Sequence, residues 1–536
     1  MEEVVERRKR LEKFDFFVLD NSIRESAVGQ LRGHTLQDKI RIYHEVKKCR
    51  MTSAMLVASL TEEESVDGDF CQWLLDSGED RNGMYAFAEI SGSLKDGAYD
   101  TEAVPISLQM NKKYRIANTF FEVELANKDC EWGVKFTMAD FCGLIKKRIK
   151  WVHNNISEDG CIMVNVLDLP AAMETAPTRV TELIAFLAQL PADHHVVAFC
   201  FEDPIGESDL QELKVWTARM RETMDLHGWN SGKLLVHIHN KFGTAAAAQL
   251  ECLVAGADGV WASLCEDGAI VGHASSTLTI IDLMRRGNKK VQERYNCTYL
   301  RQAAFEVSKI TTGKDPNPMQ PVYGERAMDV VFPDLGTGKF SLPHVFGEQE
   351  APQRIATLAT VSMIKQRLTS LFGADPQFSD TTIAQKMKKT ILDDLRKGRK
   401  EEYTSTCGIA VLFARSGGKI NAEMKGKIAA LEVTDRRHAA IITEVQHLYD
   451  QWDSFENSNS LSNVLSAEHW QCCRHQDTQV AGKVLATIRD SGMDWTEFLV
   501  YIKWALHEYH EAVTAAEAMQ VALEKGVIPS MQKDKQ

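Results

Sequence analysis

The sequence predicts an α/β fold in which a parallel barrel of eight strand-and-helix units is followed by a linker and a mostly α-helical C-terminal region. Short apolar runs alternate with helix-patterned stretches over about the first 300 residues. A segment rich in Pro and Gly then ends the alternation, and nearly every later stretch has helical periodicity. Alternation over this length favours a closed (β/α)8 barrel, the TIM barrel, over an open doubly wound sheet.

Eight runs of apolar or β-branched residues are the expected strands of the barrel. They cover residues 14–19, 54–60, 84–90, 119–125, 161–167, 196–201, 234–239 and 257–263. Helical periodicity between them is clearest at residues 36–49, 138–152, 178–189 and 209–226. Thr35 and Thr244 are the expected starts of the helices that follow them. Residues 70–129 alternate poorly, and the pattern does not fix the number of strands there.

Changes in composition and in apolar periodicity along the chain give the expected domain boundaries. The barrel is expected to span residues 1–310, and the linker, with short irregular elements, residues 311–350. A small helical subdomain is expected at residues 351–425 and a C-terminal helical region at 426–536. The helices expected in these two parts cover residues 355–371, 382–398, 424–452, 481–488 and 496–525.

Composition and charge exclude some classes of partner. The net charge of -13 and the pI near 5.7 argue against nucleic acid, because phosphate binding needs a basic surface. No apolar run approaches the ~20 residues that span a bilayer, so no membrane partner is expected. The 12 cysteines are scattered without a C-x-x-C motif, which is typical of reduced thiols in the cytosol. We therefore expect a cytoplasmic protein, with an organelle as the alternative location.

One strand-like run delivers two histidines at alternate positions. His237 and His239 are two residues apart, so in a strand they share one face. Arg24 and Glu25 follow the first expected strand. The carboxyl ends of the strands of a barrel meet at one face, which is where such proteins place their chemistry. We therefore expect these four side chains to lie around one site.

A carboxylate and two imidazoles form a mixed oxygen and nitrogen ligand set that suits a divalent ion such as Mn²⁺, Mg²⁺ or Zn²⁺. Such an ion polarises a carbonyl group, and Arg24 beside it would stabilise an enolate oxygen. The structural alternatives are that His237 and His239 are satisfied by neighbouring groups, and that Arg24 and Glu25 form a local ion pair.

Three motifs resemble those of the DRE-type TIM-barrel metallolyases. HIHNKFG, residues 237–243, resembles H-x-H-[ND]-x-x-G; DNSIRE, residues 20–25, is similar to D-x-[ST]-x-R-[DE]; and EDPIG, residues 202–206, resembles the D-T-x-G strand end. The motifs follow the order of that superfamily. Its members include 3-hydroxy-3-methylglutaryl-CoA lyase, isopropylmalate and homocitrate synthases, 4-hydroxy-2-oxovalerate aldolases and the carboxyltransferase domain of pyruvate carboxylase.

The resemblance implies a function and a site. It implies that Arg24 and Glu25 are catalytic, that Glu25, His237 and His239 bind the divalent metal, and that the substrate is a 2-oxo acid or an acyl-CoA. The implied reaction makes or breaks a carbon-carbon bond through a metal-stabilised enolate. PVYGERAM, residues 321–328, looks like a segment that follows the barrel of the isopropylmalate and homocitrate synthases, which are acyltransferases. A homodimer or higher homo-oligomer is also implied.

Five further residues are candidates for binding metal or substrate: Glu202, Asp203, Asn240, His273 and Thr277. Glu202 stands where the carboxyltransferase branch has a carbamylated Lys, and it would supply a carboxylate directly; the alternative is an ion pair with Lys or Arg. His273 and Thr277 fall near the place of an Asn ligand of the superfamily, and His273 is alternatively an ordinary loop residue.

A second class of function stays open. Val28 occupies the position of the general base of the aldolases, and the Asn ligand is replaced. The retained Arg24, Glu25, His237 and His239 favour the enzyme. The departures keep open the alternative of a degenerate barrel that has a binding, regulatory or assembly role and no catalysis.

Overall fold

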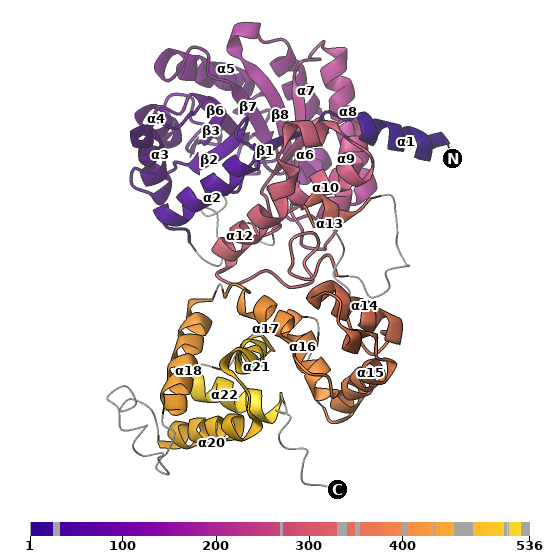
Figure 1. The fold of residues 1–536 in the computed structure, drawn as a ribbon. Helices are drawn as coiled ribbons and strands as arrows, with labels where there is room; N and C mark the ends of the chain where they lie inside the picture. The colour runs from indigo at the N-terminus through magenta and orange to yellow at the C-terminus, as the bar shows by residue number, and fades with distance from the viewer. Residues whose placement is uncertain are drawn as a thin grey trace. The chain divides into compact units, whose positions relative to one another are not determined.

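The structure is a computed structural model, and two compact units make it up. It describes residues 2–24, 33–268, 272–329, 340–348, 354–398, 403, 405–433, 435–454, 475–508, 512 and 514–526. Described residues up to 328, together with 340–348, form a barrel unit, and those from 354 onward form a helical unit (Figure 1).

Eight parallel strands close into a barrel in the order β1-β10-β9-β8-β7-β6-β3-β2. The strands are β1 Phe17–Asp20, β2 Met55–Ser59, β3 Met84–Glu89, β6 Asn118–Val123, β7 Ile162–Val166, β8 Val196–Asp203, β9 Lys233–Ile238 and β10 Gly259–Ala262. A small antiparallel hairpin, β4 Leu94–Lys95 with β5 Ala98–Tyr99, lies between β3 and β6 in the chain. The predicted barrel is confirmed, and each of the eight predicted runs overlaps one of its strands.

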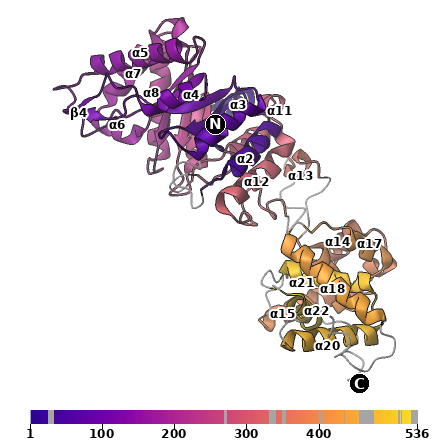
Figure 2. The same cartoon turned by 90° about the vertical axis from the view of Figure 1, so that its left-hand side faces the viewer.

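Helices surround the barrel, as Figures 1 and 2 show for α5, α7 and α8. Those of the barrel unit are α1 Glu2–Lys13, α2 Leu36–Lys48, α3 Val66–Ser77, α4 Ile106–Lys113, α5 Met138–Asn155, α6 Leu169–Thr175, α7 Pro177–Ala188, α8 Leu210–Leu226, α9 Ala245–Ala255, α10 Ser276–Arg285, α11 Lys290–Arg294, α12 Leu300–Thr312 and α13 Leu342–Val345. Thr35 begins α2 as predicted, through a capping box with Asp38. Thr244 precedes α9 as predicted, but its side chain makes no capping hydrogen bond.

Two apolar cores fill the barrel unit. The inner core lies inside the barrel and holds Leu19, Leu56, Phe87, Phe120, Met163, Cys200, Leu235 and Trp261, among others. The larger outer core lies between the strands and the helices and uses the intervening residues, such as Val236 and Ile238 on β9. Alternate residues of each strand therefore serve different cores, as the two-residue period of a strand requires.

The helical unit has one continuous apolar core. Its helices are α14 Val361–Phe372, α15 Thr381–Arg396, α16 Thr406–Arg415, α17 Ala422–Ala429, α18 Arg436–Ser454, α20 His475–Ser491, α21 Trp495–Glu508 and α22 Ala515–Glu524. Side chains from Ile355 to Leu523 belong to a single buried cluster. The boundary expected between residues 425 and 426 falls inside α17.

Two helices that the sequence predicts as continuous are interrupted. The predicted helix at residues 424–452 ends with α17 and resumes with α18, where Asp435 accepts a hydrogen bond from the backbone N–H of Arg437. The predicted helix at 496–525 divides into α21 and α22, and Thr514 begins α22 with a capping box. In both places a residue that caps a helix N-terminus starts a new helix.

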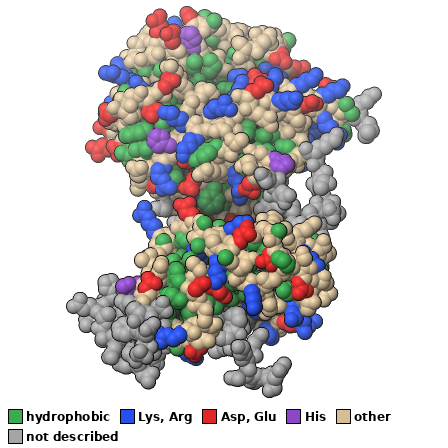
Figure 3. Space-filling view, in the orientation of Figure 1, with side chains coloured by type: hydrophobic (Ala, Val, Ile, Leu, Met, Phe, Trp, Pro, Cys, Tyr) green, Lys and Arg blue, Asp and Glu red, His purple; other side chains and the backbone are tan. Residues whose placement is uncertain are grey.

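The structure describes the surface charge, the state of the cysteines and the length of the apolar helices. Acidic and basic side chains are interspersed on the face of the barrel unit in Figure 3. The ten cysteines among the described residues are all free thiols. Within the described part of the chain, no helix is long and apolar enough to cross a membrane.

A buried ion pair joins the loops that follow β1 and β2. Lys39 Nζ on α2 lies 2.8 Å from Asp67 Oδ1 on α3, and their side chains are only 1% and 5% exposed. Lys39 also donates to the carbonyl of Ile23 at 2.7 Å, and Asp67 accepts from the backbone N–H of Ser59 at 2.6 Å. These bonds satisfy the buried charges on both sides and fix the two loops relative to each other.

Replacing Lys39 with Met is expected to destabilise the protein by about 3–5 kcal/mol, because Asp67 would be left buried and unpaired. Adding Asp67→Asn should recover part of this loss, since Asn still accepts from Ser59 without carrying a charge. Lys47→Met, which breaks the exposed pair with Glu79, is the control and should cost under about 1 kcal/mol. Urea unfolding measures all three, and equal losses for Lys39→Met and Lys47→Met would contradict the prediction.

Candidate metal centre

A layer of polar side chains lies at the mouth of the barrel, the end where the parallel strands finish. Inner-core residues on five neighbouring strands are Phe87, Phe120, Met163, Cys200 and Leu235. The residues two positions further along are Glu89, Glu122, Asn165, Glu202 and His237. Because residues i and i+2 of a strand share a face, these five side chains project into the mouth.

Three of the mouth residues converge on one point. Glu202 is the last residue but one of β8, His237 is its register partner on β9, and His239 follows β9 directly. His239 Nε2 lies 3.2 Å from Glu202 Oε1 and 3.2 Å from His237 Nε2. One ligand atom from each of the three residues lies within 4.8 Å of the others, and all three residues are buried. We call this set the Glu202–His237–His239 cluster.

The spacing of the cluster fits a divalent ion. Ions that bind nitrogen or oxygen at about 2.1 Å, with ligands roughly 90–109° apart, separate neighbouring ligand atoms by about 3.0–3.4 Å. The two measured separations of 3.2 Å lie in this range. The three ligand atoms, two imidazole nitrogens and one carboxylate oxygen, lie together in a buried place. The donor set therefore fits Mn²⁺, Mg²⁺ or Zn²⁺.

His237 is oriented for metal binding by the next strand. Its Nδ1 lies 2.7 Å from the carbonyl oxygen of Trp261, which only accepts, so Nδ1 carries the hydrogen. The imidazole also stacks on the Trp261 indole, with ring centroids 4.1 Å apart. In the neutral imidazole the lone pair is then on Nε2, the atom that faces His239 and the one that would bind a metal.

Glu202 has no Lys or Arg partner among the described residues. Oε1 faces His239, and Oε2 accepts a long hydrogen bond of 3.5 Å from Asn165 Nδ2. The ion pair that was the alternative for Glu202 is therefore absent from this part of the structure, and its carboxylate points to the two imidazoles.

Arg24 lies at the same mouth. It sits in the turn after β1, is 9% exposed, and donates from Nε to Ser59 Oγ at 2.9 Å. Its guanidinium carbon is 5.3 Å from the ring centroid of Phe87 and 5.8 Å from that of Trp261. Trp261 therefore contacts both Arg24 and His237. Glu25, like Val28, belongs to residues 25–32 and lies outside the described residues, so its role as a ligand stays a prediction.

Two of the further candidates bind the backbone. Asp203 accepts hydrogen bonds from the backbone N–H groups of Gly206 at 2.8 Å and Ser208 at 3.2 Å, and so shapes the turn after β8. Asn240 Oδ1 accepts from the N–H of Ala245 at 3.1 Å, which provides the cap for α9 that Thr244 does not.

The other two candidates approach the cluster differently. His273 pairs with His239 in an antiparallel bridge, and its ring centroid is 4.9 Å from that of His237. Its Nε2 lies 3.3 Å from Ser263 Oγ. Thr277 lies in the first turn of α10, and its buried Oγ1 finds no partner among the described residues. The structure thus places His273 beside the histidine pair.

The sequence reasoning missed Glu89, Glu122 and Asn165. Burial, followed by the nearby charge of Glu202, raises the pKa of Glu122 to about 8, although Arg24 and a hydrogen bond from Asn165 oppose the shift. Burial also raises the pKa of Glu89. A pattern in the sequence could have revealed Glu89, Glu122 and Asn165. Each is a polar residue near the end of a strand, two positions after an apolar residue that faces the inside of the barrel.

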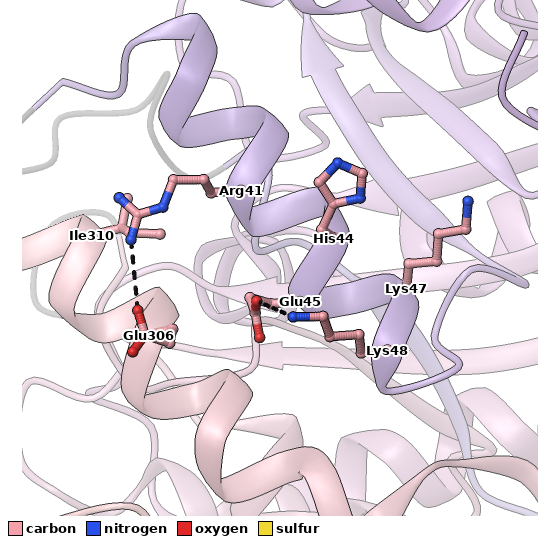
Figure 4. Close-up of a pocket in the computed structure, with 7 residues that line it drawn as sticks. All are labelled: Arg41, His44, Glu45, Lys47, Lys48, Glu306 and Ile310. Atoms are coloured by element: carbon pink, nitrogen blue, oxygen red, sulfur yellow. Dashed lines mark hydrogen bonds and ion pairs between the residues drawn. The ribbon is translucent and has the colours of Figure 1, made fainter. Parts of the chain in front are cut away.

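A separate hollow on the outside of the barrel carries no comparable chemistry. It has a volume of about 580 Å³, lies between α2 and α12, and is lined by Arg41, His44, Glu45, Lys47, Lys48, Glu306 and Ile310 (Figure 4). Each of its three cations already faces a carboxylate: Arg41 faces Glu306, Lys47 faces Glu79 and Lys48 faces Glu45. Such paired side chains are typical of a solvated helix face.

Replacing Glu202 with Gln is expected to weaken the binding of Mn²⁺ at least ~10-fold, because a charged oxygen ligand is lost while the side-chain shape is kept. Isothermal titration of the metal-free protein measures this affinity. Glu207→Gln is the matched control, since Glu207 is exposed in the turn after β8 and pairs with Lys241. Unchanged stoichiometry and affinity in Glu202→Gln would exclude this residue as a ligand.

The raised pKa of Glu122 predicts how stability depends on pH in the metal-free protein. Between its ordinary value of 4.5 and its folded value of about 8, the folded protein holds a proton that the unfolded protein has lost. The free energy of unfolding therefore falls as pH rises through this window. Glu122→Gln lacks this titration, so urea unfolding in EDTA should show it gaining stability relative to wild type between pH 5 and pH 8. A constant difference would contradict the shift.

Comparisons with known proteins find similar solved structures at low identity. No family model and no curated protein matches the chain. Among solved structures, the chain is similar to HMG-CoA lyase from Brucella melitensis, with 13% identity, a TM-score of 0.42, and coverage of 56% of this chain and 99% of that one. The chain is also similar to the hydroxymethylglutaryl-CoA lyase of Pseudomonas aeruginosa, with 14% identity and a TM-score of 0.42. The match covers 59% of this chain and 97% of that one.

The carboxyl transferase domain of Rhizobium etli pyruvate carboxylase is also similar, with 11% identity, a TM-score of 0.40, and coverage of 98% of this chain and 80% of that one.

Proposed function

We propose that this protein is a divalent-metal-dependent enzyme that makes or breaks a carbon-carbon bond beside a carbonyl group. The observation that carries this proposal is the buried Glu202–His237–His239 cluster at the mouth of the barrel, with His237 held in its metal-binding tautomer by Trp261. A divalent ion bound there would polarise the substrate carbonyl and make the neighbouring C–H bond more acidic.

Arg24 supplies the second part of the proposed chemistry. Its guanidinium is a permanent cation, held by Ser59 and placed against the faces of Phe87 and Trp261. A cation fixed in advance in a place with little water stabilises developing negative charge without further reorganisation. We assign to Arg24 the stabilisation of the enolate oxygen.

The proposed substrates are a 2-oxo acid, an acyl-CoA, or both. This choice rests on the motifs around Arg24, Glu202 and His237, which resemble those of enzymes that act on such molecules. Of the possible reactions, we propose an acyl transfer like that of the isopropylmalate and homocitrate synthases, in a cytoplasmic homodimer or larger homo-oligomer.

Metal analysis of the purified protein, followed by an exchange assay, tests the proposal. We expect about one Mn²⁺, Mg²⁺ or Zn²⁺ per chain, and metal-dependent exchange of the methyl hydrogens of pyruvate with deuterium from D2O, measured by NMR. His237→Ala should lose both, because it removes a ligand and opens the stack on Trp261. His44→Ala, which alters the hollow on the outside of the barrel, should keep both.

Absence of both bound metal and exchange would overturn the proposal and favour the degenerate barrel with a binding or assembly role. Bound metal with exchange that persists in His237→Ala would also contradict it, because the exchange would then arise elsewhere.

A further inference from the structure

We infer that Glu122 is the acid-base residue of this site, the group that removes a proton from the substrate carbon and returns it. The inference rests on the proposed function. It supplies the proton-transfer group that the sequence comparison does not locate, since Val28 occupies the corresponding position of the aldolases.

The position of Glu122 in the barrel is the first argument. It lies near the end of β6, in register with Glu89 on β3 and Asn165 on β7. The residue two positions before it, Phe120, is in the inner core, so the carboxyl group reaches the layer that also holds Glu202 and His237. Glu122 is partly exposed, whereas Glu202 is buried. It can therefore meet a substrate that enters the mouth.

The charged groups around Glu122 are the second argument. Glu202 and Glu89 act on it as like charges, and Arg24 acts as the opposite charge. A nearby carboxylate and burial favour the neutral acid, while Arg24 and Asn165 favour the carboxylate. Neither form is strongly favoured near neutral pH, which is the condition under which one group can both accept and donate a proton.

Asn165 can hold Glu122 in either form. Its amide contacts Glu122, and its Nδ2 also reaches Glu202 at 3.5 Å. Its buried Oδ1 finds no partner among the described residues. The amide nitrogen donates to a carboxylate, and the free oxygen accepts from a neutral carboxylic acid. The same side chain therefore supports Glu122 before and after the proton moves.

The step balances without any additional reactant. A carboxylate oxygen of Glu122 forms an O–H bond as the C–H bond beside the carbonyl breaks. The electron pair of that bond becomes the carbon-carbon double bond of the enolate, and the carbonyl π pair moves to oxygen as negative charge, which Arg24 stabilises. In the reverse step neutral Glu122 returns the proton to carbon, so the protein ends unchanged.

Glu89 is the competing carboxyl group, and the structure separates the two. Glu122 pairs in register with Asn165 on β7, and the Asn165 amide reaches both Glu122 and Glu202. Glu89 lies one strand further from Glu202, on β3. Glu122 is therefore the carboxyl group that is linked to the site through Asn165, and Glu89 provides a matched control on the neighbouring strand.

The test compares Glu122→Gln with Glu89→Gln in the full chain loaded with Mn²⁺. In Glu122→Gln, exchange of pyruvate hydrogens with D2O should fall roughly 100-fold or more, the range for loss of a general base. Mn²⁺ affinity should stay within about twofold of wild type, and Glu89→Gln should lose less than about fivefold of the exchange rate. Glu122→Asp should restore part of the exchange, and thermal unfolding checks that all variants are folded.

The outcomes separate this inference from the proposed function. If wild type exchanges and Glu122→Gln exchanges as fast, Glu122 is not the acid-base residue while the proposed function stands. Loss of exchange in Glu89→Gln alone assigns the role to Glu89 and overturns the inference. If Glu122→Gln loses Mn²⁺ together with exchange, Glu122 serves the metal centre and not proton transfer. If wild type binds no metal and shows no exchange, both proposals fail.

Discussion

The alternation of side chains along parallel strands decides which residues can act together in this protein. On β9, Leu235, His237 and His239 share the inner face, while Val236 and Ile238 pack outward against the helices. A shift of one residue would exchange the two sets and bury the imidazoles among helix side chains. The register of β8 with β9 places Glu202 opposite His237. The geometry of the Glu202–His237–His239 cluster is therefore a consequence of strand pairing.

This arrangement concentrates negative charge in a place with little water. Three carboxyl groups, Glu89, Glu122 and Glu202, stand on the strands around the mouth, and Arg24 is a cation that acts on Glu122. Burying several carboxylates is costly unless protons, hydrogen bonds or cations compensate. A proton on Glu122 compensates one of these charges. A divalent ion at Glu202 would compensate another, so metal binding is expected to stabilise the folded barrel as well as to serve chemistry.

The barrel was predictable from the sequence because its strands are short apolar runs with clear ends. The prediction also placed His237, His239, Arg24 and Glu202 at one end of the barrel, because their motifs follow the strands, and the structure finds them at the mouth. It missed Glu122 because the prediction used motifs and did not follow the inward face of β6 beyond Phe120. It missed α16 because that helix, residues 406–415, is almost entirely buried and so has no polar face to show helical periodicity.

Breaks between helices were harder to predict for a different reason. Periodicity continues across residues 424–452, and only the capping residues show that the chain stops and restarts. The sequence contains a capping-box pattern at this break, made by Thr514 and Glu517. Apolar periodicity reports which face is buried, whereas capping residues report where a helix begins. The first signal extends over many residues and therefore dominates when the two conflict.

Arg24 depends on contacts that lie outside the mouth. Its Nε is held by Ser59 Oγ, the backbone N–H of Ser59 is held by Asp67, Asp67 pairs with Lys39, and Lys39 binds the carbonyl of Ile23, the residue before Arg24. These four contacts and the peptide bond between Ile23 and Arg24 join the five residues in a closed ring. The ring joins the β1 and β2 loops to α2 and α3. It therefore holds both the backbone next to Arg24 and the Nε atom of its side chain. Because every member is at least partly buried, the loss of one charge would disturb the others. The position of the Arg24 guanidinium is thus set in part by an ion pair that lies behind it, on α2 and α3.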